Sequence, residues 1–379
     1  MIKLLHTSDW HLGRVLHEKP LLEDQAHVLG QITEILHGDP HDLLIMAGDI
    51  YDRSLPPADA VALLSRFLTE LRRKSEVPVV MIPGNHDSAL RLSYCAEMLS
   101  LSGIHIRSEA ACAHEPIRLS KGNDTVNIYA IPFLEPGIFD AHREGEEAVK
   151  GSHEEALEHL VEIIRSGMDH NAVNICVGHL YTRRGLTSDS ERVMVGGAGE
   201  VDPALFDDFA YTALGHLHRP QEVSGKVHYS GSPIKYSFSE CGDTKGVLSV
   251  TIAGEIQDIA TIPLTPLRDM VRLRGSFQSL LNDEKFVEYR GHYVEAEVTD
   301  GGIITNPLVS LRERFPHILS VRQAAPQMKS GERSTVPSVS EMGTLEDDYR
   351  AFHAYIHGEE ASAEKMELFE KIRRERNTP

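Results

Sequence analysis

The sequence has 379 residues, a hydrophobic content of 41% and a formal net charge of −19. This length predicts two or three domains, and no apolar run approaches the roughly 20 residues that span a bilayer. Four widely spaced cysteines without a CxxC pair argue against a disulfide framework or zinc finger, and with the early polar N-terminus they predict a cytoplasmic protein. The acidic balance alone does not favour nucleic-acid binding, which usually needs a basic face.

The first part of the chain alternates strand-like and helix-like segments. Short apolar runs predict buried strands at 4–6, 42–47 and 77–82. Apolar residues at helical spacing predict helices over 22–36 and 61–71. Further strands are predicted at 126–131, 173–177, 211–214, 226–229, 247–252 and 256–262. This order indicates a layered α/β domain over 1–265, with parallel strands early and antiparallel strands late.

The pattern changes near residue 267. Strands at 269–274, 293–298 and 318–321, with helices at 276–281 and 308–314, predict a small α+β domain over 266–322. Residues 323–340 are rich in Pro, Ser and Gly and predict a linker. Two helices are predicted in 341–379, with the apolar stripes Leu345, Tyr349, Phe352 and Ile356, then Met366, Phe369 and Ile372. We expect these helices to dock on a partner chain; packing back on this chain is the alternative.

Five short polar segments each follow the end of a predicted strand, at 8–11, 48–52, 84–87, 178–179 and 215–218. One such segment alone would indicate a turn or a surface histidine. Five in order indicate a site, because sites of layered α/β folds form at strand ends. Their imidazoles and carboxylates suit borderline divalent ions such as Mn, Fe, Co or Zn. We therefore predict a binuclear centre in which Asp49 bridges two ions ~3.5–4 Å apart.

These motifs, D-x-H, G-D-x-x-D, G-N-H-D, G-H and G-H-x-H, resemble those of the calcineurin-like metallophosphoesterase superfamily. Segments 7–13, 181–185, 188–192 and 195–199, with the residues at 231–233 and 243–246, narrow the resemblance to the SbcD family of bacterial nuclease subunits. The resemblance covers about residues 1–325 and implies a β-sandwich flanked by helices. It also implies a DNA-capping role for 266–322 and partner-binding helices in 341–379.

The resemblance implies ligands for two ions. Those of the first ion would be Asp9, His11, Asp49 and His218. Those of the second would be Asp49, Asn85, His179 and His216. His86 would approach the scissile phosphate without binding metal, and we expect Asp87 to orient His86. Related sequences tend to carry histidine at the position of Asp52, so we expect Asp52 to contact a ligand, and we expect Trp10 to pack beneath the ions.

The function implied by the resemblance is that of a Mn²⁺-dependent DNA exonuclease and endonuclease, acting in DNA repair, recombination and replication. The implied partner is an SbcC-like coiled-coil ATPase, in a heterotetramer with a nuclease homodimer. The homodimer contact would involve helices within 61–71 and 90–101, for which core packing is the alternative. Arg183, Arg184 and Arg192 would contact DNA phosphates or form a solvated loop. The alternative functions are another hydrolase of the superfamily, acting on phosphomonoesters or cyclic nucleotides, and a non-catalytic scaffold.

Overall fold

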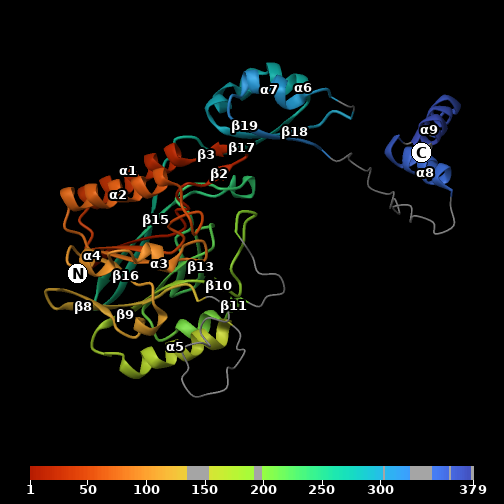
Figure 1. Ribbon diagram of the computed structural model, residues 1–379. Helices are drawn as coiled ribbons and strands as arrows, with labels where there is room; N and C mark the ends of the chain where they lie inside the picture. Colours follow the sequence, from red (N-terminus) through yellow and green to blue (C-terminus); the bar gives the residue numbers. More distant parts are fainter. Residues whose placement is uncertain (135–152, 192–198, 302–303, 325–343, 358–359, 377–379) are drawn as a thin grey trace. The chain divides into compact units, whose positions relative to one another are not determined.

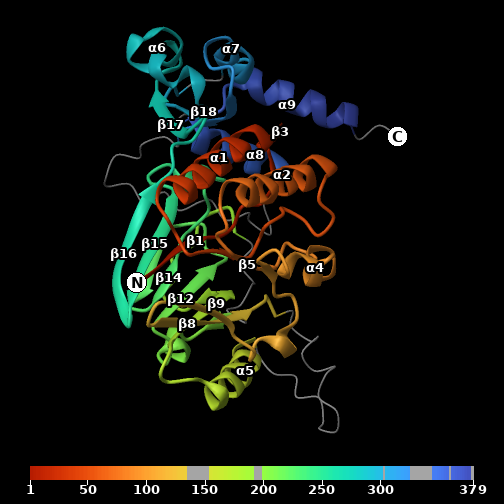
Figure 2. The same cartoon turned by 90° about the vertical axis from the view of Figure 1, so that its left-hand side faces the viewer.

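The computed structural model describes residues 1–134, 153–191, 199–301, 304–324, 344–357 and 360–376. The chain forms two compact units, Met1–Ala324 and Ala325–Pro379. In the first unit two six-stranded sheets pack face to face, with helices over both outer faces (Figures 1 and 2). Within the described ranges, no helix is both long and apolar enough to cross a membrane.

The first sheet has the strand order β16-β15-β1-β4-β5-β6. Its strands β1, β4, β5 and β6 run parallel, with β6 at one edge, whereas β15 runs antiparallel to both neighbours. The bounds are β1 (Ile2–Thr7), β4 (Leu43–Ala47), β5 (Val79–Ile82), β6 (Ile104–Ile106), β15 (Gly246–Ala253) and β16 (Glu255–Pro263). Helices α1 (Leu22–Gly38) and α2 (Ala58–Lys74) cover the outer face, because their apolar residues recur at helical spacing and pack into one cluster with the strands.

The second sheet has the strand order β13-β14-β12-β9-β8-β7. Strands β14, β12, β9 and β8 run parallel, and β13 and β7 pair antiparallel at the two edges. The bounds are β7 (Ile117–Lys121), β8 (Asp124–Ile131), β9 (Val173–His179), β12 (Tyr211–Gly215), β13 (Gln221–Ser224) and β14 (Val227–Tyr229). Helix α5 (His153–Gly167) covers the outer face of this sheet through Leu157, Leu160, Val161 and Ile164.

Apolar side chains from the inner faces of both sheets fill the space between the sheets. Ile45 and Val80 of the first sheet belong to the same buried cluster as Ile128 and Val177 of the second. The central strands are buried on both faces, which is why β4 is a continuous apolar run. The predicted fold, a layered sandwich flanked by helices, is confirmed.

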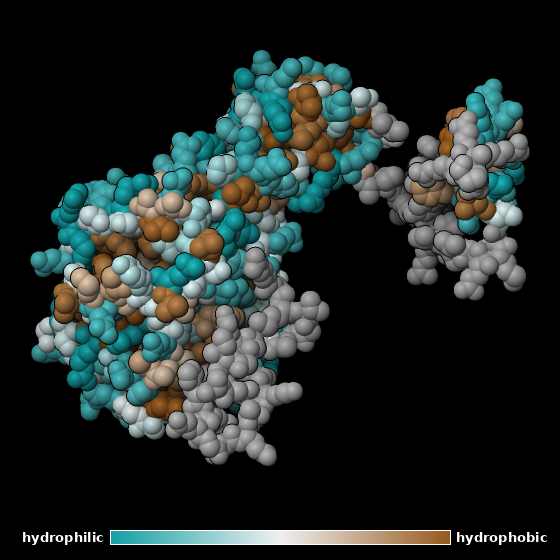
Figure 3. All heavy atoms as spheres, viewed as in Figure 1, coloured by the Kyte–Doolittle hydropathy of each residue, from teal (hydrophilic) through white to brown (hydrophobic). Residues whose placement is uncertain are grey.

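A third sheet lies in the region of the predicted α+β domain. Its strands β17 (Met270–Gly275), β18 (Tyr293–Val298) and β19 (Ile318–Gln323) are all parallel. Helical crossovers connect these strands, as parallel pairing requires, and consist of α6 (Phe277–Asn282), η5 (Glu284–Gly291) and α7 (Pro307–Arg314). The crossovers pack on one face of the sheet, and Figure 3 shows apolar side chains gathered over α6 and α7.

The third sheet is fastened to the sandwich by apolar contacts and by one buried carboxylate. Met270, Tyr293 and Leu319 join the apolar cluster under α1 and α2. Asp24, at the start of α1, is 1% exposed. It accepts a hydrogen bond from the Tyr293 hydroxyl at 2.8 Å and pairs with Arg268 at 2.9 Å. Sequence-distant polar groups therefore fix this sheet against the first turn of α1.

Segment 89–101 forms two short helices, α3 (Ala89–Leu92) and α4 (Ala96–Ser100), instead of a core helix. Leu90, Tyr94, Met98 and Leu101 are 85%, 79%, 69% and 89% exposed, so core packing is wrong for these side chains, whereas Leu92 is 7% exposed and belongs to the cluster under α1 and α2. By contrast, α2 buries Leu64, Phe67 and Leu71. The other short elements are β2 (Val15–Leu16), β3 (Lys19–Pro20), η1 (Ala110–Cys112), β10 (Tyr181–Thr182), β11 (Glu200–Val201), η3 (Pro203–Phe206) and η4 (Phe238–Glu240).

The second unit contains the helices α8 (Leu345–His357) and α9 (Ala363–Arg376). The Tyr349 ring of α8 stacks on the Phe369 ring of α9, with ring centroids 4.3 Å apart. Glu346, near the start of α8, pairs with Arg373, near the end of α9, so the two helices lie antiparallel. Apolar side chains remain exposed on this pair (Figure 3), namely Leu345, Phe352, Leu368 and Ile372.

Candidate metal centre

The predicted site residues lie where five parallel strands end. Strand β1 is followed by Asp9 and His11, β4 by Asp49, β5 by Asn85 and His86, and β12 by His216 and His218, whereas His179 is the last residue of β9. Four of these residues have a positive φ, which is uncommon outside glycine: 54° at Asp9, 43° at His11, 49° at Asp49 and 103° at His216. Backbone strain of this kind persists at functional sites, where the surrounding structure enforces it.

Two glycines allow the strand ends to approach closely. A Cβ atom on Gly84 would lie 2.2 Å from Asp49 Oδ1, and one on Gly215 would lie 1.9 Å from the carbonyl oxygen of Ala47. Neither position can accept a side chain without moving its neighbour. Gly215 of the G-H-x-H motif therefore lets the two sheets come into contact at the site, whereas Gly84 of the G-N-H motif lets the loops after β4 and β5 of the first sheet approach each other.

The Asp49 carboxylate lies at the centre of the cluster. Its Oδ2 atom is 3.5 Å from Nε2 of His11, 3.5 Å from Nε2 of His179 and 4.0 Å from Nε2 of His86. Its Oδ1 atom accepts a hydrogen bond from the backbone N–H of His86 at 2.8 Å. Burial by itself raises the pKa of Asp49, but the protonated imidazole of His179 holds it well below the usual range. Asp49 is therefore an ionised carboxylate that faces imidazoles from both sheets.

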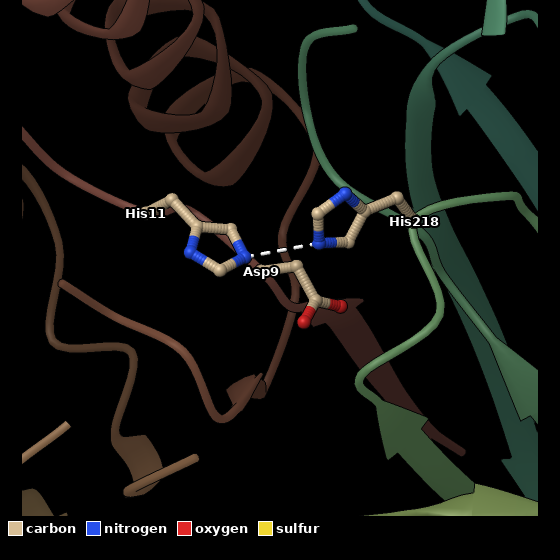
Figure 4. A group of neighbouring side chains, drawn as sticks. All are labelled: Asp9, His11 and His218. Carbon is tan, nitrogen blue, oxygen red and sulfur yellow. Dashed lines mark hydrogen bonds between the residues drawn. The ribbon is translucent and has the colours of Figure 1, made fainter. Parts of the chain in front are cut away.

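Asp9, His11 and His218 form one group of potential ligands (Figure 4). The Nε2 atoms of His11 and His218 face each other at 3.0 Å. Burial holds the pKa of both imidazoles well below its usual value, so both rings are neutral and offer lone pairs. Asp9 lies below them and accepts hydrogen bonds from the Ser8 hydroxyl at 2.5 Å and the His216 N–H at 2.9 Å. Burial raises the pKa of Asp9 to about 7.

Asn85, His179 and His216 converge on the other side of Asp49. The amide oxygen of Asn85 is 3.0 Å from His179 Nε2 and 2.9 Å from His216 Nδ1. The His179 Nδ1–H donates to the Ala47 carbonyl at 2.9 Å, which directs Nε2 into the site. Burial by itself lowers the pKa of His179, but the Asp49 carboxylate raises it to about 9. A divalent ion would take the place of this proton, because metal binding requires the neutral imidazole.

The residues of this cluster fit divalent metal ions. Every ion pair of Asp49 in the described part of the chain is with an imidazole, and no lysine or arginine neutralises it. Buried carboxylate and imidazole atoms converge with the amide oxygen of the half-buried Asn85. Asp49 belongs to two overlapping groups whose ligand atoms lie within 4.8 Å of one another, one with Asp9 and His179, the other with His11 and His86. His86 is thus within reach of an ion bound beside Asp49.

The structure corrects the expected role of Asp87. Its carboxylate does not contact the His86 ring; it accepts backbone N–H groups of Ile50 and Gly84 at 2.9 Å and of Tyr51 at 2.8 Å. Asp87 therefore joins the loop after β4 to the loop after β5. The His86 ring is oriented by the Asp52 carbonyl oxygen, which accepts from Nδ1 at 2.7 Å.

Two further sequence expectations concern the surroundings of His11. The carboxylate of Asp52 lies 3.7 Å from His11 Nδ1 and 3.5 Å from the Arg14 guanidinium, so it contacts a candidate ligand as expected. Trp10 is fully buried, packs edge-on against Phe67 and donates to the Thr7 hydroxyl at 2.9 Å. The side chain of Trp10 therefore supports the loop that includes Asp9 and His11.

The three arginines predicted to contact DNA differ in their surroundings. Arg183 forms ion pairs with Glu154 at 2.5 Å and with Asp202 at 3.4 Å, so phosphate binding would have to replace these partners. Arg184 is exposed and has a φ of 73°. Arg192 lies outside the described residues.

Sequence reasoning assigned no role to several polar residues that contact the candidate ligands. Gln25, on the buried face of α1, donates to the carbonyl oxygens of Trp10 and His11 at 3.0 and 2.7 Å. Ser190 and Glu191 contact His218. Ser190 and Glu191 lie in segment 188–192, which contributes to the family resemblance and could have marked them as candidates. The motif alone does not indicate that they contact His218.

Comparison with known families gives two matches. Residues 2–220, more than half of the chain, match the calcineurin-like phosphoesterase family. Residues 266–353 match a second family model, SbcD_C, described as the type 5 capsule protein repressor C-terminal domain.

Similar folds occur among solved structures. The protein TT1561 of Thermus thermophilus is 14% identical, with a TM-score of 0.38, over 61% of this chain and 89% of that one. The calcineurin-like phosphoesterase YfkN of Bacillus subtilis is also 14% identical, with a TM-score of 0.38, over 70% and 90% of the two chains. A dimetal phosphatase of Danio rerio is 11% identical, with a TM-score of 0.43, over 70% and 99%.

Proposed function

Because this chain belongs to the calcineurin-like phosphoesterase family, which indicates a metal-dependent hydrolase, we propose that it hydrolyses phosphodiester bonds of DNA as an SbcD-type nuclease. We propose both exonuclease and endonuclease activity, with manganese as the metal, in the processing of DNA ends and hairpins during repair and recombination. The observation that carries this proposal is a buried His/Asp cluster fit for metal ions on a chain whose residues 266–353 match the SbcD C-terminal domain.

The proposed ligands of one ion are Asp9, His11, Asp49 and His218, and those of the other are Asp49, Asn85, His179 and His216. When bound, two divalent ions lower the pKa of water and neutralise charge on a phosphodiester. Asp49 would serve both ions, because Oδ1 is held by the His86 N–H while Oδ2 faces imidazoles from both sheets. Imidazole-rich ligation supports manganese over magnesium, which prefers oxygen ligands.

The protein's own contribution to the chemistry would come from His86. Its Nδ1–H donates to the Asp52 carbonyl oxygen, so Nε2 is the ring nitrogen available to a substrate. His86 is 8% exposed, so it is close to the surface but largely shielded from water. As an imidazolium it would neutralise charge on the phosphate or donate a proton to the leaving oxygen.

DNA binding by an acidic chain needs local positive charge. The net charge of −19 opposes a polyanion, so we propose that bound cations, Arg184, the Arg183 and Arg192 side chains, and a partner chain supply the attraction. We also propose that residues 266–322 help to position DNA over residues 1–265, with 323–340 as a linker.

The test is a cleavage assay with the full chain in Mn²⁺, with and without chelator. Substrates are linear duplex and hairpin DNA, a phosphomonoester and a cyclic nucleotide. We expect metal-dependent cleavage of DNA, and a His86→Gln chain that loses activity by roughly a hundredfold or more while binding as much Mn²⁺ as the unchanged chain. His37→Gln, an exposed site in α1, is the matched control. Hydrolysis of the phosphomonoester or cyclic nucleotide without DNA cleavage would refute the nuclease proposal, and loss of Mn²⁺ would make His86 a ligand.

We propose that the helical pair α8–α9 binds an SbcC-like coiled-coil ATPase, in a heterotetramer built on a nuclease homodimer. The Tyr349–Phe369 stack holds the two helices together, whereas Phe352 and Leu368 are 62% and 57% exposed. Exposed apolar side chains on an amphipathic helix fit a helix-in-groove contact. The four cysteines are free, which supports a reducing cytoplasm as the location.

Partner binding can be tested in the full chain with Phe352→Asp. We expect this variant to lose association with the co-expressed ATPase and to keep Mn²⁺-dependent cleavage of DNA. Ile163→Asp, which changes a 39% exposed isoleucine of α5 in the first unit, is the matched control and should keep both properties. Association that survives Phe352→Asp together with Leu368→Asp would contradict the docking proposal.

A further inference from the structure

A chain of buried polar groups starts at the His218 ring and leads away from the candidate metal centre. His218 Nδ1 is 2.6 Å from the Ser190 hydroxyl, and the same hydroxyl donates to Glu240 Oε1 at 2.6 Å. The other oxygen of Glu240 pairs with the Lys245 ammonium at 2.6 Å. The residues are 9% exposed at Ser190, 0% at Glu240 and 5% at Lys245. Burying such an ion pair is costly, so its place beside a candidate ligand calls for an explanation.

The same group of residues also holds the backbone of His218. Lys245 Nζ donates to the His218 carbonyl oxygen at 2.6 Å. Glu191 Oε1 accepts from the His218 N–H at 2.7 Å. The ring, the amide and the carbonyl of His218 are therefore fixed by three neighbouring side chains.

The number of available protons determines the tautomer of His218. A carboxylate only accepts hydrogen bonds, and a serine hydroxyl has a single proton to donate. The Ser190 proton therefore points to Glu240 Oε1, so the Ser190 oxygen must accept at its contact with His218 and at its 2.7 Å contact with the Ser188 hydroxyl. It follows that His218 has its proton on Nδ1 and a free lone pair on Nε2. That lone pair faces His11 Nε2, at 3.0 Å, in the candidate metal centre.

We propose that Glu240 and Ser190 are positioning residues that fix His218 in the tautomer able to bind a metal ion, and that Lys245 fixes the orientation of Glu240. This inference rests on the proposed metal centre and deepens it. It assigns a role to residues that touch neither the ions nor a substrate. A histidine ligand commonly depends on a partner for its second nitrogen, and loss of that partner weakens metal binding by about 10- to 100-fold.

Glu240→Gln is the most informative variant, because Lys245 dictates how the new amide lies. The ammonium needs an acceptor, so the amide oxygen takes the place of Oε2 and the amide nitrogen faces Ser190. The amide then donates to the Ser190 oxygen. In a Ser188→Ala background, which removes the other acceptor 2.7 Å from Ser190 Oγ, the Ser190 proton turns toward His218 Nδ1. The His218 proton moves to Nε2, where it opposes metal binding. Removing the ammonium by Lys245→Met allows the amide to turn over and restores the original tautomer.

The experiment is a calorimetric Mn²⁺ titration of the full chain without DNA. Every chain compared carries Ser188→Ala, and the chain with that change alone is the reference, called the unchanged chain. For the unchanged chain we expect two ions per chain. For Glu240→Gln and for Ser190→Ala, we expect one of the two to bind at least about tenfold more weakly. Glu240→Gln combined with Lys245→Met should bind that ion more tightly than Glu240→Gln alone, and Ser190→Thr should bind like the unchanged chain. If Glu240 and Lys245 only stabilised the fold, the double variant would bind Mn²⁺ more weakly than Glu240→Gln alone, because the double variant lacks a second buried polar group.

The matched control is Ser239→Ala. The Ser239 hydroxyl oxygen accepts from the Asp189 N–H at 3.0 Å, so it holds the same loop to η4 without reaching His218. We expect this variant to bind both ions normally. Three results would each overturn the proposal. The first is unchanged Mn²⁺ binding in both Glu240→Gln and Ser190→Ala, and the second is weaker Mn²⁺ binding by the double variant than by Glu240→Gln alone. The third is an unchanged chain that binds fewer than two ions. Failure to cut DNA by a chain that binds two ions would refute the proposed function and leave the positioning role standing.

Discussion

Replacing Gly215 by alanine tests whether the contact between the two sheets creates the site. The new Cβ would lie 1.9 Å from the Ala47 carbonyl oxygen, 2.9 Å from His179 Nδ1 and 2.9 Å from the Ser8 Cβ. Real Cβ contacts essentially never fall below 3.0 Å, so the ends of β4 and β12 must separate by roughly 1 Å. The Ala47 oxygen also accepts the hydrogen bond of His179, so the same movement would disturb a candidate ligand.

The expected cost follows from the kind of clash. Overpacking a buried site costs about 1–3 kcal/mol, and here both partners are fixed strand ends, so we expect about 3 kcal/mol. That value corresponds to roughly a hundredfold change in the unfolding equilibrium constant. Gly225→Ala is the matched control, because a Cβ there meets nothing within 4 Å. The control should change stability by less than about 1 kcal/mol, in the stabilising direction, because alanine restricts the unfolded chain.

The assay is urea unfolding of both full-length variants, followed by a Mn²⁺ titration. Gly215→Ala should unfold at a clearly lower urea concentration than Gly225→Ala and should bind the ion at His179 more weakly. Equal midpoints and equal Mn²⁺ binding in the two variants would refute the argument that this glycine sets the approach of the sheets.

Three further predictions concern stability and assembly. In urea unfolding, Asp24→Ala should lower the free energy of unfolding by about 1–3 kcal/mol, because it leaves the buried Tyr293 hydroxyl and part of the Arg268 guanidinium without an acceptor. The control is Glu23→Ala, which removes a 71% exposed partner of Arg268 and should cost under about 1 kcal/mol. Mn²⁺ at a hundred times its dissociation constant should stabilise the chain by about 2.7 kcal/mol per site, seen as a raised melting temperature that chelator abolishes. If exposed side chains of segment 89–101 form the homodimer contact, Leu101→Glu should give monomers in analytical ultracentrifugation, whereas Val309→Glu in α7 should not.

The sandwich could be predicted because its strands have simple local signals. Strands such as β4 are uninterrupted apolar runs, and each polar motif follows such a run directly. Helix α5 was not predicted, although Leu157, Leu160, Val161 and Ile164 have the spacing of a helical face. In segment 89–101 the apolar content suggested a core, but burial depends on tertiary packing, and there Leu90 and Leu101 remain at the surface.

The parts of the site that could not be predicted depend on contacts between distant segments. Asp87 follows His86 directly, yet its carboxylate accepts from Ile50 and Tyr51 in another loop. Glu240 lies 50 positions from Ser190, and no local pattern links them. Motif spacing identifies residues that converge at strand ends, whereas the hydrogen-bond partners of each residue follow from the three-dimensional approach of loops.

We propose that side chains from both sheets bind two metal ions on either side of Asp49. The most direct measurement is anomalous X-ray diffraction at the manganese edge from crystals of the full chain grown with Mn²⁺. The account predicts two anomalous peaks about 3.5–4 Å apart, one beside His11 and His218 and one beside Asn85, His179 and His216. A single peak, or peaks away from the Asp49 carboxylate, would contradict it.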